Sequence, residues 1–297
     1  MITIFTPTYN RAYRLPVLYS SLQRQTNMDF EWIIVDDGSQ DHTKELVESW
    51  LKGEAPFRIR YILKENGGKH TAINKGVELA QHEWFFIVDS DDYLTNDAVQ
   101  KIHEWVADVT DSSIAAVAGI SCYPDNKIIG QCGIEQGTYV DAPNYERKKY
   151  RLLGDKAEVY RTEILKKYPF PVFPGERFLS EGAVWDKIAL DGYKVRWFNH
   201  PLKVCEYLPD GLTYQLRGTD IEIRNFEGCT YYTQVVLQAY HGIDKIRIIC
   251  QYINKARKKG LTYRETADRI DRSIAEILLL SIPVHIKNWI KGRTKGR

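Results

Sequence analysis

Hydrophobic and polar positions alternate in four similar blocks along the first hundred residues. In each block, a short apolar run ends in a polar cluster, and an amphipathic stretch follows. The apolar runs are Ile2–Thr6, Glu31–Val35, Arg58–Leu63 and Trp84–Val88, and the amphipathic stretches are Arg14–Gln25, Thr43–Leu51, Thr71–Ala80 and Asp97–Val106. The spacing of Leu15, Leu18 and Leu22 is helical. A strand, a loop and a helix repeated in this way predict an α/β fold with a mainly parallel sheet covered by helices.

The second half of the chain follows a less regular pattern. We expect a strand at Ile114–Ile120, a strand followed by a helix in Lys156–Leu165, a helix at Gly182–Leu190, and strands at Tyr193–Phe198 and Leu202–Tyr207. From Asp220 onward the pattern becomes helical, as in the spacing of Ile246, Ile249 and Ile253. The chain therefore divides into an α/β part, residues 1–217, and a helical C-terminal extension, residues 218–297.

Charge is distributed unevenly over the 297 residues. The net charge of +2 excludes a strongly polyanion-binding body, so we do not expect nucleic acid as a partner. From Asp244 onward, however, the chain has 14 basic and 5 acidic residues. Near its end, Trp289 and Ile290 are flanked by Lys287, Lys291, Arg293, Lys295 and Arg297. This segment suits peripheral contact with an anionic membrane; the alternative is that it packs on the rest of the chain.

The spacing of the cysteines and the hydropathy of the chain indicate the cellular compartment in which we expect the protein. The five cysteines (Cys122, Cys132, Cys205, Cys229 and Cys250) lack Cys-x-x-Cys spacing, and we expect no disulfide framework. No stretch approaches the ~18 apolar residues of a membrane-spanning helix. An apolar strand pattern begins directly after Met1, without the features of a signal segment. We therefore expect a cytoplasmic protein, with any membrane contact peripheral and at the inner face.

The polar clusters that follow the apolar runs are the candidate site. In a parallel sheet, the carboxyl ends of the strands share one edge, and ligands bind there. Asp89–Asp92 follows Trp84–Val88, which is apolar on both faces and therefore a central strand. Mg²⁺ and Mn²⁺ take one or two carboxylates together with substrate phosphate oxygens, so Asp89 and Asp91 can serve a metal and a ribose. The alternative is a turn that caps the next helix.

Two further clusters carry groups suited to a nucleotide. Asp37 can accept a hydrogen bond from a nucleobase, while Gly38 permits close approach of a ligand. Gly67–Lys69 opens a helix, where backbone N–H groups and a lysine favour a diphosphate. Both clusters also fit ordinary turns. Neither a Walker loop nor a Gly-x-Gly-x-x-Gly pattern occurs, which argues against a P-loop NTPase and a nicotinamide dehydrogenase.

In their order along the chain, these segments resemble the motifs of family 2 glycosyltransferases, enzymes of the GT-A fold. The resemblance covers roughly residues 1–106 and rests on Thr6–Arg11, Val35–Ser39, Asn66–Gly68 with Asn74, and Val88–Asp92. It implies a catalytic domain at 1–217, with a nucleotide-binding half at 1–106 and an acceptor-binding half at 107–217. It also implies a nucleotide-sugar donor, usually a UDP-sugar, inversion at the anomeric carbon, and Mn²⁺ or Mg²⁺ as cofactor.

The resemblance assigns roles to individual residues. Asp37 meets the base, Asp89 lies near the ribose and the metal, and Asp91 ligates the metal. The donor-binding set implied by the resemblance is Pro7, Thr8, Tyr9, Arg11, Asp37, Gly68, Lys69, Asn74, Asp89 and Ser90.

The catalytic base implied by the resemblance is an acid at the start of a helix in the second half. Glu181 occupies that position, although the Asp that often pairs with it in the family is missing here; Asp186 and Glu176 are the alternatives. A base so placed takes the proton from an acceptor hydroxyl as that oxygen attacks the donor sugar. Three aromatic residues can either stack on a sugar or belong to the core: Trp185, Trp197 and Tyr207. The loop Tyr207–Tyr214 can close over the donor or form a plain turn.

Two other functions are compatible with parts of this pattern. A sugar-phosphate nucleotidyltransferase would have a Gly-rich, Arg-containing loop after the first strand, where this chain has Thr6–Asn10. A non-catalytic protein that binds nucleotide-sugars or glycans would explain the missing Asp beside Glu181. The expected setting is the assembly of a cell-surface polysaccharide or glycolipid, on a glycan or lipid-linked acceptor.

Overall fold

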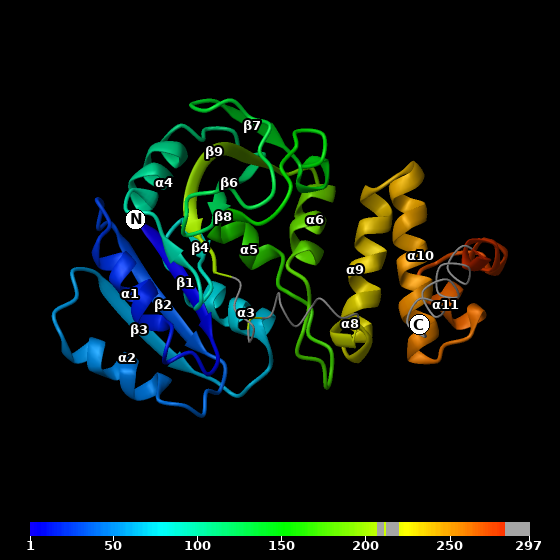
Figure 1. Ribbon diagram of the computed structural model, residues 1–297, viewed down its shortest axis with the longest axis horizontal. Coiled ribbons are helices and arrows are strands. Elements are labelled where there is room, and N and C mark those ends of the chain that lie inside the picture. The colour runs from blue at the N-terminus through cyan, green and yellow to red at the C-terminus, as the bar shows by residue number, and fades with distance from the viewer. Residues whose placement is uncertain (207–210, 212–219, 283–297) are drawn as a thin grey trace.

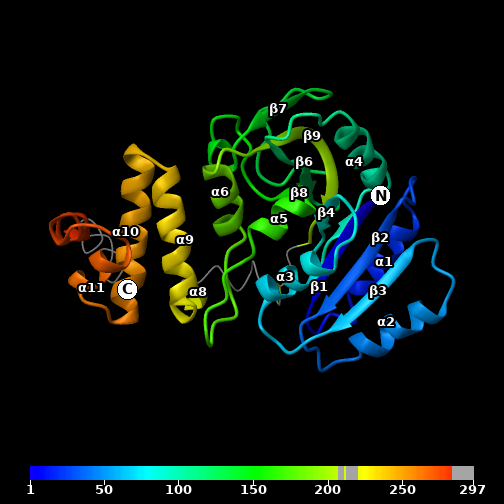
Figure 2. The same ribbon diagram turned by 180° about the vertical axis from the view of Figure 1, so that it is seen from behind.

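The computed structural model describes residues 1–206, 211 and 220–282. Within them a nine-stranded sheet has the order β3-β2-β1-β4-β8-β6-β9-β5, and β7 pairs with β9. Helices cover both faces of this sheet, and a group of helices lies beside it, next to α6 (Figures 1 and 2). The expected α/β fold, with helices flanking a large sheet, is confirmed.

The first half of the sheet is parallel, as the sequence predicted. Its strands are β1 (Ile2–Thr8), β2 (Phe30–Asp36), β3 (Arg58–Leu63) and β4 (Trp84–Ile87), and its helices are α1 (Leu15–Gln23), α2 (Thr43–Lys52) and α3 (Lys69–Leu79). Every residue of β1 and β2 is buried, because helices cover both faces of these strands. The carboxyl ends of β1, β2 and β4 consequently lie together.

The second half makes the sheet mixed. Its elements are α4 (Ala98–Ala107), β5 (Tyr93–Leu94), β6 (Ile114–Cys122), β7 (Tyr139–Ala142), the 3₁₀ turn η1 (Asn144–Glu146), β8 (Lys156–Arg161), α5 (Thr162–Lys167), α6 (Gly182–Leu190) and β9 (Lys194–Val204). Strand β8 runs antiparallel to both β4 and β6. The expected parallel arrangement therefore holds for strands β1 to β4 but not for the whole sheet.

One strand assignment was wrong in detail. The two strands expected at Tyr193–Phe198 and Leu202–Tyr207 form one continuous strand, β9, with Pro201 in its interior. Register shifts between β6 and β9 on either side of Ile120, which pairs with Pro201, accommodate the proline. The short strands β5 and β7 were not predicted, because two to four residues carry too little alternation to be distinguished from a loop.

The hydrophobic core has three parts. One lies on the sheet face that α3, α5 and α6 cover and includes Phe5, Phe85 and Trp185. A second lies on the opposite face, under α1, α2 and α4, and includes Trp32 and Phe86. The third joins helices of the C-terminal region, α9 (Phe226–Ala239), α10 (Gly242–Lys259) and α11 (Tyr263–Arg269).

The C-terminal helices pack on the sheet through α6 and α9. Helix α8 (Asp220–Arg224) precedes α9, and residues 274–282 are also helical. Of the stripe expected on α10, Ile249 and Ile253 are fully buried, whereas Ile246 is exposed. Among the described residues, no helix combines the length and the apolar character needed to cross a bilayer.

Candidate active site

A cavity of about 1200 Å³ opens at the carboxyl ends of β1, β2 and β4 and extends toward α6, α9 and α10. It brings together most of the side chains that the sequence singled out. Those that line it are Pro7, Thr8, Tyr9, Arg11, Asp37, Gly68, Lys69, Asp89, Ser90, Asp91 and Glu181. The prediction that these distant segments share one site is therefore supported by their position along one edge of the sheet.

Asn74 is the exception among the residues expected to bind the donor, because it does not line this cavity. Its amide nitrogen donates to the carbonyl of Phe170, and its amide oxygen accepts from the backbone N–H of Phe170, both at 2.8 Å. Asn74 lies more than one turn into α3, on a face that meets the loop after α5 rather than the cavity. Its role here is to tie that loop to α3.

Asp37 holds the loop that opens α3. Its buried carboxylate accepts hydrogen bonds from the backbone N–H groups of Gly67 and Gly68, at 3.0 and 2.7 Å, and from the Lys64 ammonium at 2.6 Å. Gly68 has φ +92°, and a Cβ there would lie 2.0 Å from the Arg177 carbonyl oxygen, so only glycine fits. This close approach joins the start of α3 to the segment that leads into α6.

The end of β1 offers a second polar group. The hydroxyl of Thr8 is buried and has no hydrogen-bond partner among the described residues, and it lines the cavity beside Asp37. The backbone N–H of Asp37 donates to the Thr8 carbonyl at 2.8 Å, which fixes the two strand ends together. A buried hydroxyl without a partner is unfavourable in the free protein and suits a site that a ligand completes.

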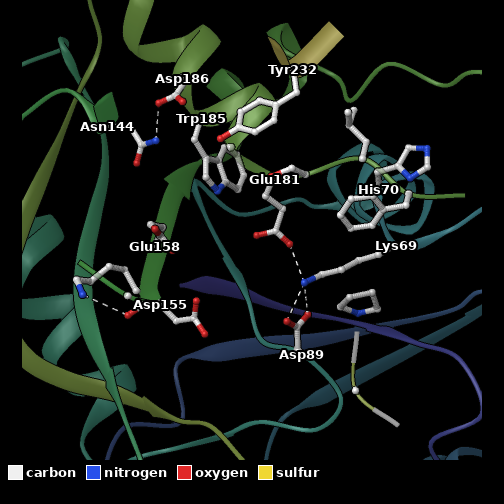
Figure 3. Close-up of a pocket in the computed structure, with 18 of the residues that line it drawn as sticks. Lys69, His70, Asp89, Asn144, Asp155, Glu158, Glu181, Trp185, Asp186 and Tyr232 are labelled. Carbon is white, nitrogen blue, oxygen red and sulfur yellow. Dashed lines mark hydrogen bonds and ion pairs between the residues drawn. The ribbon is translucent and has the colours of Figure 1, made fainter. Parts of the chain in front are cut away.

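Lys69 is the central cation of the site. Its ammonium lies 2.7 Å from the Asp89 carboxylate and 2.7 Å from that of Glu181 (Figure 3). Burial opposes the charge on Lys69, but the two carboxylates outweigh burial and hold its pKa above the ordinary value. Burial likewise acts to raise the pKa of Asp89, whereas Lys69 and Lys203 hold it below the usual value.

The three acids after β4 have different partners. Asp92 forms a buried ion pair with Lys203 at 2.9 Å, and burial nevertheless raises the pKa of Asp92 to about 6. Asp91 is half-buried, and its carboxylate makes no hydrogen bond or ion pair with another described residue. Burial, followed by the neighbouring Asp89, raises the pKa of Asp91. Lys203 was not predicted from the sequence, although a lysine within an apolar strand was a possible signal.

This donor set fits a divalent metal that the substrate helps to bind. No group of three or more His, Cys, Asp or Glu side chains in the described residues is arranged to hold a metal by itself. Asp91 is a hard oxygen ligand that forms no ion pair within the described residues, and Asp89 lies next to it. Mg²⁺ and Mn²⁺ sites in nucleotide-binding proteins commonly use one or two carboxylates, with phosphate oxygens and water completing the shell.

Glu181 occupies the N-cap position of α6 and points toward Lys69 (Figure 3). The alternative acids lie elsewhere. Glu176 accepts hydrogen bonds from the backbone N–H groups of Glu227 and Gly228 at the start of α9, so it anchors that helix instead. Asp186 lines the same cavity as Glu181 but lies farther along α6, hydrogen-bonded to Asn144.

The aromatic candidates divide between the cavity and the core. Trp185 lines the cavity and stacks on Tyr160 with ring centroids 4.2 Å apart. Trp197 is fully buried, and its indole N–H donates to the Ala142 carbonyl, so it belongs to the core. Tyr207 lies outside the described residues. Of the loop Tyr207–Tyr214, only Gly211 lies within them, and it lines the cavity.

The far part of the cavity was missed by sequence reasoning, apart from Asp186. Its lining comes from η1, β8, α9 and α10 and includes Asn144, Arg147, Lys156, Glu158, Tyr232, Tyr240 and Asp244. These residues lie on segments far apart in the sequence and form no motif, so no local pattern could have brought them together.

Comparison with known proteins identifies the family. The family model described as glycosyl transferase family 2 matches residues 3–168. The chain belongs to glycosyl transferase family 2. This confirms the family that the four strand-end motifs indicated.

Individual relatives agree with this assignment. The chain is 33% identical to the chondroitin synthase of Pasteurella multocida over 274 residues, which are 92% of this chain and 25% of that protein. It is 27% identical over 191 residues to the GalNAc(5)-diNAcBac-PP-undecaprenol beta-1,3-glucosyltransferase of Campylobacter jejuni, covering 62% of this chain and 58% of that one. The chain thus spans a quarter to about three fifths of the length of these curated relatives.

A solved structure supports the GT-A fold. The structure of Staphylococcus aureus TarS 1-349 in complex with UDP superposes with a TM-score of 0.61 at 19% identity, covering 87% of this chain and 72% of that one.

Proposed function

We propose that this protein is an inverting glycosyltransferase that moves a sugar from a UDP-sugar to a hydroxyl group of a glycan or lipid-linked acceptor. The observation that carries the proposal is the position of Glu181. It stands at the first turn of α6, facing Asp89 across Lys69, inside the cavity that the strand-end residues line. An acid placed opposite the donor-binding edge is what an inverting transfer needs. Residues 1–217 are proposed as the catalytic domain.

We propose that the nucleotide-sugar donor binds along the carboxyl ends of β1, β2 and β4. Pro7, Thr8 and Tyr9 contact the nucleoside, Asp37 meets the base, and Lys69 at the N-terminus of α3 faces the diphosphate. Asp91, with Asp89 beside it, would hold Mn²⁺ or Mg²⁺, which when bound supplies positive charge that stabilises the leaving diphosphate.

Transfer then requires one proton acceptor. Glu181 accepts the proton of the acceptor hydroxyl as that oxygen forms a bond to the anomeric carbon. The bond from the anomeric carbon to the diphosphate oxygen breaks, and its electron pair leaves with UDP. Because the oxygen attacks on the face opposite the leaving group, the configuration inverts. Lys69 orients Glu181 through their ion pair and keeps its carboxylate directed into the cavity.

The relatives support the substrate class. A chondroitin synthase builds a polysaccharide, and the Campylobacter enzyme is named for an undecaprenol-linked acceptor. The UDP in the TarS complex supports uridine in the donor. On this basis we propose a cytoplasmic enzyme of cell-surface polysaccharide or glycolipid assembly.

The test is release of UDP or GDP from a panel of nucleotide-sugars, with MnCl₂ or with EDTA. We expect metal-dependent UDP release from at least one UDP-sugar, and slower or no release from GDP-sugars. Binding of UDP-sugars without any release or transfer would favour the non-catalytic alternative. Formation of pyrophosphate from UTP and a sugar 1-phosphate would favour the nucleotidyltransferase.

We also propose that the basic C-terminal region contacts an anionic membrane. Among the described residues, Ile243, Ile246, Leu279 and Ile282 are 43–66% exposed on α10 and the last helical segment, so apolar side chains of this region are accessible to a membrane surface. The basic residues from Lys287 onward lie outside the described residues. Sedimentation with anionic and neutral vesicles tests the proposal: the full chain should bind anionic vesicles at low salt, and Ile243→Ser with Ile246→Ser should weaken binding. Equal binding to neutral vesicles would contradict it.

A further inference from the structure

A second polar cluster lies in the cavity beyond Glu181. Asp186 is only 2% exposed and accepts a hydrogen bond of 2.7 Å from the Asn144 amide. Asn144 is 8% exposed, and its own amide oxygen is buried without a partner among the described residues. Both residues line the cavity. Two hydrogen-bond acceptors, the Asp186 carboxylate and the Asn144 carbonyl oxygen, are therefore held at the cavity wall with fewer donors than they can use.

A phenol from another helix completes the cluster. Tyr232 lies on α9, and a Cβ added to Gly182 would lie 3.1 Å from its hydroxyl oxygen, so this hydroxyl stands over the first turn of α6. It makes no hydrogen bond to another described residue. Figure 3 shows Asn144, Asp186 and Tyr232 on one side of Glu181, with Lys69 and Asp89 on the other side. The cluster thus lies away from the proposed donor site, with Glu181 between.

Glu181 and Asp186 line the same cavity, so one ligand can reach both acids. A ring whose reacting hydroxyl meets Glu181 can therefore direct its other hydroxyls to Asp186, Asn144 and Tyr232. Gly182, between the two acids, carries no side chain, and this lets the Tyr232 hydroxyl lie close to the first turn of α6.

A purely structural role does not account for the cluster. Hydrogen bonding between Asn144 and Asp186 ties η1 to α6, but it leaves the Asn144 oxygen unsatisfied in a buried position. Burial also raises the pKa of Asp186, which is unfavourable for an acid that only serves packing. Both costs are removed if hydroxyl donors of a ligand occupy the site.

We propose that Asn144, Asp186 and Tyr232 form the acceptor subsite and that it takes a neutral pyranose ring. This inference rests on the proposed function. The site presents a carboxylate and a carbonyl oxygen, so it favours hydroxyl donors. It disfavours a carboxylate or phosphate placed against Asp186, because two anions would then face each other with little water between them, although Arg147 and Lys156 in the same part of the cavity offset part of this repulsion. The site would also distinguish between neutral sugars. A ring without hydroxyls in the matching positions would leave the Asp186 carboxylate and the Asn144 carbonyl oxygen without hydrogen-bond donors.

The experiment is saturation-transfer NMR on the full chain with UDP and MgCl₂ present. The probes are the methyl β-glycosides of N-acetylglucosamine, galactose and glucose, with methyl β-glucuronide as the anionic comparison. We expect binding of at least one neutral glycoside and weaker binding of the glucuronide. Tyr232→Phe and Asp186→Asn keep the shapes of the side chains and should each weaken that binding five- to tenfold, the effect of losing a hydrogen bond.

Matched controls and a separate donor measurement make the result decisive. Tyr231→Phe changes the neighbouring tyrosine, which does not line the cavity, and Asp191→Asn changes an exposed acid just after α6; neither should alter glycoside binding. UDP affinity, measured by calorimetry, should be unchanged in all four variants. Unchanged glycoside binding in both subsite variants, stronger binding of the glucuronide, or no binding of any neutral glycoside by the wild type would overturn the inference. Failure of the wild type to bind UDP would instead contradict the proposed function.

Discussion

The ammonium of Lys69 lies 2.7 Å from the carboxylate of Glu181, and this ion pair joins helices from the two halves of the sheet. Lys69 begins α3, whereas Glu181 caps α6, more than a hundred residues later. The same ammonium also contacts Asp89, which lies beside the proposed metal ligand Asp91. Lys69 therefore pairs with two acids, Asp89 and the proposed base Glu181. The strand-end edge and the start of α6 are thereby held at a fixed separation.

Loss of the Lys69 charge should impair the site as a whole. In Lys69→Met, Asp89 and Glu181 face each other without the shared cation, and the diphosphate loses a positive neighbour. We expect transfer to fall about ten- to hundredfold, the range for a lost charge-assisted hydrogen bond. Steady-state UDP release is the measurement. Lys75→Met, which removes a partly exposed lysine of the same helix that pairs with Glu78, is the control and should remain active.

Glu181→Gln tests the proposed base directly. The amide cannot accept the proton of the acceptor hydroxyl, so we expect transfer to drop ~10²–10⁴-fold while UDP binding stays within about twofold of wild type. Calorimetry and transfer assays separate the two effects. Near-normal turnover in this variant, together with an inactive Asp186→Asn, would move the base to Asp186.

The adjacent acids Asp91 and Asp92 should behave differently when neutralised. Asp91 has no cationic partner among the described residues, so Asp91→Asn should leave the free energy of unfolding near that of wild type and abolish the effect of Mn²⁺ on UDP affinity. Asp92→Asn leaves the buried Lys203 ammonium without its carboxylate partner and should destabilise the fold by about 3 kcal/mol. Denaturation and calorimetry with and without Mn²⁺ distinguish them. Equal, metal-independent UDP affinity in wild type and Asp91→Asn would refute the metal role.

Asp37 should contribute to stability as well as to base selection. Asp37→Ala removes the acceptor for two loop N–H groups and leaves Lys64 without its carboxylate, so we expect a loss of about 2–4 kcal/mol in the free energy of unfolding. The Asp37→Ala variant should also lose the preference of the wild type for UDP over GDP. Adding Lys64→Met should recover part of the stability but not the preference. A retained preference in the single variant would show that Asp37 does not contact the base.

Asp186→Asn should stabilise the protein in a pH-dependent way. Burial raises the pKa of Asp186 in the folded protein to about 6, above its ordinary value of 3.8. The folded state therefore keeps the proton that the unfolded state releases, and the wild type loses stability as the pH rises from about 4 to 6. At pH 7.5 the variant should be more stable by up to about 3 kcal/mol, and the difference should shrink toward pH 4.5. Urea denaturation at both pH values is the measurement; a less stable variant at pH 7.5 would contradict the burial argument.

Sequence patterns predicted the secondary structure of residues 1–106 closely. The bounds of β3 were predicted to the residue, and those of the other elements expected in residues 1–106 to within one or two, whereas the short strand β5 was not expected. This succeeds because strand and helix periodicities are local properties. Parallel strands then force their carboxyl ends to one edge, so Pro7, Asp37 and Asp89 had to meet there once the topology was known.

Only the tertiary structure decided how individual side chains are used. Asn74 belongs to the family motif, yet the packing of α3 against the loop after α5 turns it away from the cavity. Lys69 could be placed beside a diphosphate from its helix N-terminus, but its contact with Glu181 depends on how α6 is positioned. The cluster of Asn144, Asp186 and Tyr232 comes from three separate segments, and contacts between residues so distant in sequence depend on the packing of whole elements, which no local pattern encodes.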